Sequence, residues 1–263
     1  MRLAIPSRSL LARVVAPLSF VAAGTAFTSG LDHTSLRTLN ELNGPVRSAT
    51  VAPALPAAAV ETVASAQGDQ RPSLNVEGVD NKHIDRWVDR LTTTAKRDFA
   101  NSLARMSKYA GMITKKLDER QMPKDLVYLA MIESNFDPNA KSPAKAVGLW
   151  QFMSATARQF GLTVGGKVDE RKNPAKATDA ALSYLSKLHD RFGSWYLAAA
   201  AYNSGEGTVS RALKKETGRT KGTDADFFRI LPRLPRETQQ YVPKLIASAR
   251  VGNSITRQGA ALD

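Results

Sequence analysis

One carboxylate, that of Glu133, falls on an apolar helical face. Leu126, Leu129, Ala130 and Glu133 are spaced i, i+3, i+4 and i+7, so they share the side of a helix that should turn to the core. Burial on that face and the negative end of the helix dipole would both raise the pKa of the carboxyl. A carboxylic acid that stays protonated near neutral pH can act as a general acid on a glycosidic oxygen. Glu133 is therefore a candidate catalytic acid, and a Glu that turns to solvent or pairs with a Lys is the alternative.

The helix that carries Glu133 is one of several that the sequence predicts. Residues 124–134 are bracketed by Pro123 and Pro138, which favour the start and the end of a helix. From Asn81 onward apolar residues recur with a helical period, and no run of alternating β-branched residues is long enough to require a sheet. We therefore expect an all-α domain. Its other helices are predicted around residues 84–91, 99–110, 154–161, 181–193, 195–202 and 236–250.

The N-terminal residues are not expected to belong to this domain. A basic, acid-free head precedes a weakly polar run, and the small residues Gly24 and Ala26 fit a signal-peptide cleavage site. An uncleaved anchor is the alternative. From Pro45 to Pro72 the composition is dominated by Ala, Pro, Val, Ser and Thr without a sustained period, which is typical of a linker. The predicted organisation is a signal peptide (1–26), a low-complexity linker (27–80), a folded domain (81–252) and a tail (253–263).

Composition excludes several kinds of chemistry. The 263 residues include 37 Lys+Arg, 24 Asp+Glu, three His and no Cys, with a net charge of +13. Without Cys there can be no disulfide, thiol nucleophile, Cys-ligated zinc or lipid anchor on an N-terminal cysteine. The three His are widely separated in sequence, so we expect no metal and no other cofactor.

The excess of positive charge indicates an anionic partner. Export favours an envelope polymer over nucleic acid, and no zinc finger or recognisable helix-turn-helix charge pattern is present. The stretch from Gly161 to Lys167 has the spacing of a phosphate-binding loop, but Val168 stands where such a loop needs Ser or Thr. Neither a nucleic acid nor a nucleotide is therefore expected as a ligand.

Five ordered motifs follow one another across the predicted domain. They are Glu133-Ser134, Gly148-Leu-Trp-Gln151, Val168-Asp-Glu-Arg-Lys-Asn-Pro174, Ala201-Tyr-Asn-Ser-Gly205 and Glu237-Thr-Gln-Gln-Tyr241-Val-Pro-Lys244. In these motifs the chain resembles the lytic transglycosylases of the soluble-lytic-transglycosylase, goose-lysozyme-like superfamily, and most closely their membrane-bound lytic murein transglycosylase D branch. Lys145 and Ser154 depart from the usual pattern, and neither replaces the acid.

The resemblance implies a lysozyme-like helical fold and cleavage of the β-1,4 bond between N-acetylmuramic acid and N-acetylglucosamine in peptidoglycan. Relatives form a 1,6-anhydromuramyl end, because the muramyl C6 hydroxyl attacks its own anomeric carbon. By this likeness Glu133 is the single acid and base. One carboxylate suffices when the nucleophile belongs to the substrate, an exception to the usual paired-carboxylate scheme.

The resemblance also implies which side chains bind the glycan. The residues at matching positions are Ser142, Gln151, Tyr202, Asn203 and Tyr241. Ser142 and Gln151 could instead make turn and helix-start hydrogen bonds, Tyr202 could be a core residue, and Asn203 could end its helix. Asp137 is interpreted as a local turn former, and Glu206 and Glu237 as partners of helix ends.

We therefore expect an exported, monomeric lytic transglycosylase that acts on peptidoglycan strands in the periplasm or cell envelope and is not a lipoprotein. Two alternatives stay open at this point. One is a hydrolytic goose-type muramidase with the same fold, and the other is a non-enzymatic basic protein that binds the cell wall.

Overall fold

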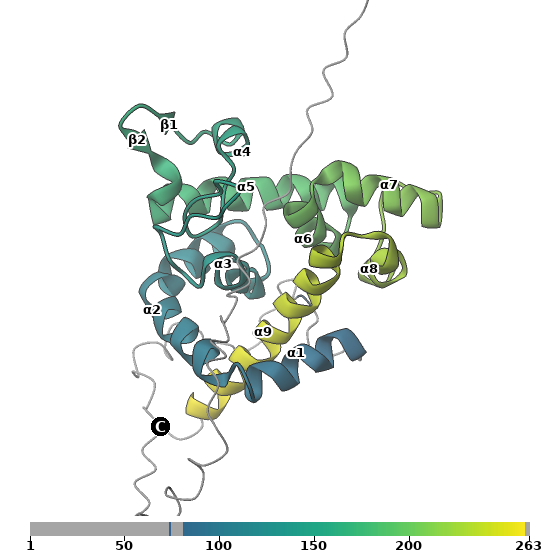
Figure 1. Ribbon diagram of the computed structural model, residues 1–263, viewed down its shortest axis with the longest axis horizontal. Helices are drawn as coiled ribbons and strands as arrows, with labels where there is room; N and C mark the ends of the chain where they lie inside the picture. The colour runs from purple at the N-terminus through teal and green to yellow at the C-terminus, as the bar shows by residue number, and fades with distance from the viewer. Residues whose placement is uncertain (1–73, 75–80, 261–263) are drawn as a thin grey trace, which may run out of the picture.

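The computed structural model describes Leu74 and residues 81–260, which are almost entirely helical (Figure 1). The all-α prediction is confirmed. The predicted signal peptide, and the predicted linker apart from Leu74, lie outside the described residues. The elements are α1 (Lys82–Thr92), α2 (Lys96–Glu119), η2 (Lys124–Leu126), α3 (Val127–Ser134), α4 (Ser154–Gln159), β1 (Val164–Gly165), β2 (Val168–Asp169), η3 (Glu170–Lys172), α5 (Pro174–Phe192), α6 (Trp195–Ser204), α7 (Glu206–Thr217), α8 (Asp224–Ile230), η4 (Leu231–Arg233) and α9 (Arg236–Ala260). The two strands form a short antiparallel hairpin.

Local sequence explains where the site-bearing helices begin and end. α3 follows Pro123 and the single turn η2, and it stops at Asn135, whose backbone is left-handed with φ 52°. Asn is among the residues that adopt this conformation most readily. α6 is capped by Ser194, whose side chain accepts a hydrogen bond from the backbone N–H of Leu197. The local sequence therefore fixes the end of α3 and the start of α6.

The last helix, α9, lies against α1, α3 and α6 and connects the two ends of the domain (Figure 1). It runs to Ala260, so the predicted helix end near Arg250 is too early and the residues expected to be a tail are helical as far as 260. Packing of Asn253 explains the extension. Its side chain donates to Asp125 Oδ1 (2.9 Å) and accepts from Tyr128 Oη (3.1 Å), so this part of α9 is bound to the start of α3.

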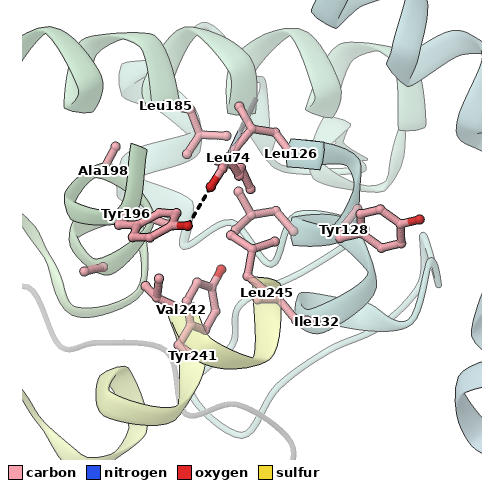
Figure 2. Packing of buried hydrophobic residues seen from close by; sticks show 14 of the residues in the cluster. Leu74, Leu126, Tyr128, Ile132, Leu185, Tyr196, Ala198, Tyr241, Val242 and Leu245 are labelled. Atoms are coloured by element: carbon pink, nitrogen blue, oxygen red, sulfur yellow. Dashed lines mark hydrogen bonds between the residues drawn. The ribbon is translucent and has the colours of Figure 1, made fainter. Parts of the chain in front are cut away.

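The core gathers around the α3, α6 and α9 helices and includes Leu74, which is fully buried. Figure 2 shows Leu74 next to Leu126, Leu185 and Tyr196. Its backbone N–H donates to Asp125 Oδ2 (3.3 Å), and its carbonyl accepts from Tyr196 Oη (2.6 Å). One residue of the predicted linker is thus an integral part of the core.

Within Leu74 and residues 81–260, no helix combines the length and apolar character needed to cross a membrane.

Candidate active site

Glu133 and Tyr241 meet where α3 packs against α9. The Tyr241 hydroxyl donates a hydrogen bond to Glu133 Oε1 at 2.6 Å. Tyr241 itself is buried, and burial together with the neighbouring Glu133 raises its pKa well above the ordinary value. The phenol therefore stays protonated and remains a donor to the carboxylate.

The pKa of the Glu133 carboxyl is raised to about 7, chiefly because burial removes water from the charged form. The Tyr241 hydrogen bond opposes this shift, the negative charge of Glu237 adds to it, and the positive charge of Lys244 opposes it. A carboxyl that titrates near 7 can give a proton and take it back at neutral pH. This pKa is the property expected from the apolar face that carries Glu133.

A second tyrosine near the acid, Tyr202, lies on α6. Its hydroxyl donates to the backbone carbonyl of Trp150 (2.8 Å), and its ring lies 5.3 Å from that of Tyr184. The charge of Glu133 contributes to a raised pKa of Tyr202, so the two groups are within electrostatic reach of each other. Tyr202 thus joins α6 to the loop after α3, while Tyr241 makes the direct hydrogen bond to the acid.

The loop from Ala140 to Phe152 is closed by its own polar groups. Ser142 Oγ accepts from the Ala146 N–H (3.0 Å), and Gln151 Nε2 donates to the carbonyl of Gly148 (2.9 Å). Both side chains are less than a tenth exposed. In this structure Ser142 and Gln151 therefore shape the loop, and contact of either with a glycan stays a prediction.

Arg171 fixes the same loop from outside. Its buried guanidinium binds Asp169 (2.7 Å) and donates to the carbonyls of Lys145 (3.1 Å) and Phe152 (3.0 Å). Gly148 makes the close approach possible, because a Cβ there would lie 1.9 Å from the Arg171 carbonyl oxygen. Its φ of +87° also favours glycine. The Gly148-Gln151 and Val168-Pro174 motifs are therefore parts of one structural unit.

Asn203 is buried and links α6 to α9. Its amide nitrogen donates to Glu237 Oε1 (2.9 Å), and its oxygen accepts from Thr238 Oγ1 (2.8 Å). This pairing holds the first turn of α9, the helix that carries Tyr241. A direct contact between Asn203 and substrate remains a prediction.

The other carboxylates considered from sequence bind to groups of the protein. Asp137 Oδ1 accepts from the Asn139 N–H (2.8 Å), as expected for a turn former, and Glu206 pairs with Arg191 (2.7 Å) of α5. Among the described residues, Glu237 is the one other acid whose charge affects the pKa of Glu133. Glu133 is therefore the candidate for the general acid of this site.

Two neighbours of the site were not identified from sequence. Lys244 lies within electrostatic reach of Glu133, and Arg171 holds the loop. Both stand inside motifs that the sequence analysis quoted, but their roles depend on contacts between distant elements.

Part of the described chain matches a known protein family. Residues 111–224 match the family model described as the transglycosylase SLT domain. This segment of the chain is similar to transglycosylase SLT domains. The family resemblance stated from the motifs is thereby confirmed.

The chain is 42% identical over 159 residues to membrane-bound lytic murein transglycosylase D of Escherichia coli K12, covering 60% of this chain and 34% of that protein. It is also 42% identical over 106 residues to the peptidoglycan transglycosylase gp16 of Escherichia phage T7, covering 39% of this chain and 8% of that one. The solved 70 kDa soluble lytic transglycosylase of Escherichia coli is similar at 22% identity and a TM-score of 0.46, with 66% of this chain and 30% of that chain covered. The chain thus spans about a third of the length of the transglycosylase D relative.

Proposed function

We propose that this protein is a peptidoglycan lytic transglycosylase in which Glu133 is the single acid and base. The observation that carries the proposal is the Glu133 carboxyl, which lies in the segment that matches the SLT family model, accepts a hydrogen bond from Tyr241 and has its pKa raised to about 7. The relatives named above are murein and peptidoglycan transglycosylases, which supports the same substrate class.

In the first step, protonated Glu133 gives its proton to the glycosidic oxygen between N-acetylmuramic acid and N-acetylglucosamine. The bond from C1 of the muramyl residue to that oxygen breaks, and the electron pair leaves with the oxygen as a hydroxyl. Positive charge develops at C1, where the substrate's own 2-acetamido group can stabilise it. The carboxylate that remains is stabilised by the Tyr241 hydroxyl.

In the second step, the Glu133 carboxylate takes the proton of the muramyl C6 hydroxyl while the C6 oxygen bonds to C1. A 1,6-anhydro ring closes and Glu133 is protonated again, ready for another cycle. No water is consumed. The second step needs no further carboxylate. This agrees with the structure, in which Asp137 accepts a backbone hydrogen bond and Glu206 pairs with Arg191.

Glu133→Gln tests the assignment of the acid. The amide keeps the size of the side chain and can still accept the Tyr241 hydrogen bond, but it cannot donate a catalytic proton. We expect release of soluble muropeptides from purified peptidoglycan to stop while the circular dichroism spectrum is unchanged. Retained release by a folded variant would exclude Glu133 as the acid.

We further propose that the protein acts in the cell envelope, where peptidoglycan is found, after removal of residues 1–26. Mass spectrometry of protein isolated from the envelope should place the mature N-terminus near Phe27. An intact Met1 on that protein would contradict removal of this segment.

A further inference from the structure

One aromatic ring and two cations form a cluster where α1 lies against α9. The guanidinium carbon of Arg90 is 5.2 Å from the centre of the Trp87 ring, and Lys244 Nζ is 5.6 Å from it. The Trp87 indole N–H donates to Gln240 Oε1 at 3.1 Å. Contacts between a cation and an indole ring are attractive, so Trp87 keeps both charges close together. We call Trp87, Arg90 and Lys244 the cation cluster.

Lys244 connects the cation cluster to the catalytic acid. Lys244 lies on α9 about one turn after Tyr241, the residue that hydrogen-bonds Glu133. The positive charge of Lys244 lowers the pKa of Glu133, and the charge of Glu133 acts in turn to raise the pKa of Lys244. Lys244 is therefore the member of the cluster that lies within electrostatic reach of the reacting carboxyl.

The two charges of the cluster are not neutralised by an ion pair in the described part of the chain. Other cations there are paired, such as Lys116 with Asp179 and Arg191 with Glu206, both at 2.7 Å. In the part of the chain that the structure describes, no carboxylate forms an ion pair with Arg90 or Lys244. Burial lowers the pKa of Lys244, and Arg90 adds to this effect. Two neighbouring cations that disfavour each other are stabilised by an anion placed between them.

We propose that the cation cluster binds a carboxylate of the muramyl part of the substrate, next to the bond that Glu133 cleaves. This inference rests on the proposed function, because it assigns the cluster to the glycan on which Glu133 acts. Two sources offer the same chemistry: the lactyl carboxylate of a peptide-free muramyl residue, and a carboxylate of an attached peptide. Arg90 and Lys244 supply charge and donors, and Trp87 is a positioning residue for both.

Binding measurements on the Glu133→Gln protein test the proposal, since this background prevents turnover. Three tetrasaccharides serve as probes in calorimetric titrations: muramyl-containing with peptides, muramyl-containing without peptides, and an N-acetylglucosamine tetramer that has no carboxylate. Arg90→Met removes one charge of the cluster, and Arg90→Lys restores it. Lys214→Met is the matched control, because Lys214 is an exposed cation on α7. Figure 1 shows α7 apart from α1, the helix that carries Trp87 and Arg90.

We expect Arg90→Met to weaken binding of a muramyl probe by roughly fivefold, the scale of an exposed charged contact. Arg90→Lys should recover most of the affinity, and Trp87→Leu should weaken the same probe although both cations remain. Binding of the N-acetylglucosamine tetramer should be unchanged in every variant. A loss confined to the peptide-free probe identifies the lactyl carboxylate as the ligand, and a loss confined to the peptide-bearing probe identifies a peptide carboxylate.

Equal affinities of Arg90→Met and Lys214→Met for both muramyl probes would overturn the inference and leave the proposed function intact. Equal weakening of all three probes would also overturn it, since that result would show a general structural effect. Failure of the Glu133→Gln parent to bind any probe would overturn the proposed function, and this inference with it.

Discussion

Replacement of Tyr241 by Phe should move the alkaline limb of the pH–rate profile. The Tyr241 hydroxyl donates to Glu133 Oε1 at 2.6 Å and lowers the pKa of that carboxyl. A hydrogen bond to a charged group contributes about 1.5 to 3 kcal/mol, and one pKa unit corresponds to about 1.4 kcal/mol. Without the hydroxyl, the pKa of Glu133 should rise from about 7 by roughly one to two units.

The sign of the change follows from the first step, in which Glu133 must be protonated. kcat/KM falls as pH rises through the pKa of Glu133 in the free enzyme. In Tyr241→Phe this fall should therefore occur at higher pH, even though the maximal rate is lower because the carboxylate is less stabilised. The assay is the initial rate of muropeptide release at low substrate concentration. It is measured between pH 5 and pH 10 at intervals of about half a pH unit.

Tyr202→Phe is the matched control for this measurement. It also removes a phenolic hydroxyl beside the acid, but that hydroxyl donates to the Trp150 carbonyl and not to Glu133. Its profile should keep the position of the wild-type alkaline limb. An unmoved limb in Tyr241→Phe, or one displaced to lower pH, would refute the reasoning about the Tyr241 hydrogen bond.

Three further predictions concern stability and the loop. Leu74→Ala should destabilise the domain by about 2 to 5 kcal/mol, because a fully buried Leu is lost from the core, and thermal unfolding measures this; an unchanged Tm would contradict the burial. Gly148→Ala should abolish muropeptide release, because its Cβ would meet the Arg171 carbonyl oxygen, and wild-type activity would show that the loop can shift freely. Glu133→Gln should raise Tm at pH 8 but not at pH 4. Because the pKa of Glu133 is raised from 4.5 to about 7, ionisation of this carboxyl destabilises the folded protein progressively between these two values, by about 3 kcal/mol above the higher one, and has no effect below 4.5. Equal Tm shifts at both pH values would contradict this.

The sequence was sufficient to predict the helical class and the burial of the Glu133 carboxyl. The i, i+3, i+4, i+7 spacing that ends at Glu133 is a local pattern, and burial of that face is the main cause of the raised pKa. The family resemblance also directed attention to Tyr241, although its direct hydrogen bond to Glu133 emerges only when α3 and α9 pack together.

Features that depend on contacts between distant parts of the chain were not predictable in this way. Leu74 stands in a stretch without a helical or strand period, and it is buried because Asp125 and Tyr196 bind its backbone. The extension of α9 depends on Asn253, which bonds to Asp125 across the fold. Single-sequence periodicity reports local conformation and cannot identify such partners.

The central claim is that Glu133 cleaves the glycan with the substrate's own C6 hydroxyl as nucleophile. Digestion of purified peptidoglycan in water enriched in a heavy oxygen isotope, followed by mass spectrometry of the released muropeptides, tests it most directly. We predict anhydromuramyl products that are lighter by one water than reducing ends and carry no heavy oxygen, and no such products from Glu133→Gln. Reducing muramyl ends that contain the heavy isotope would show that water attacks C1, and would contradict the proposed reaction.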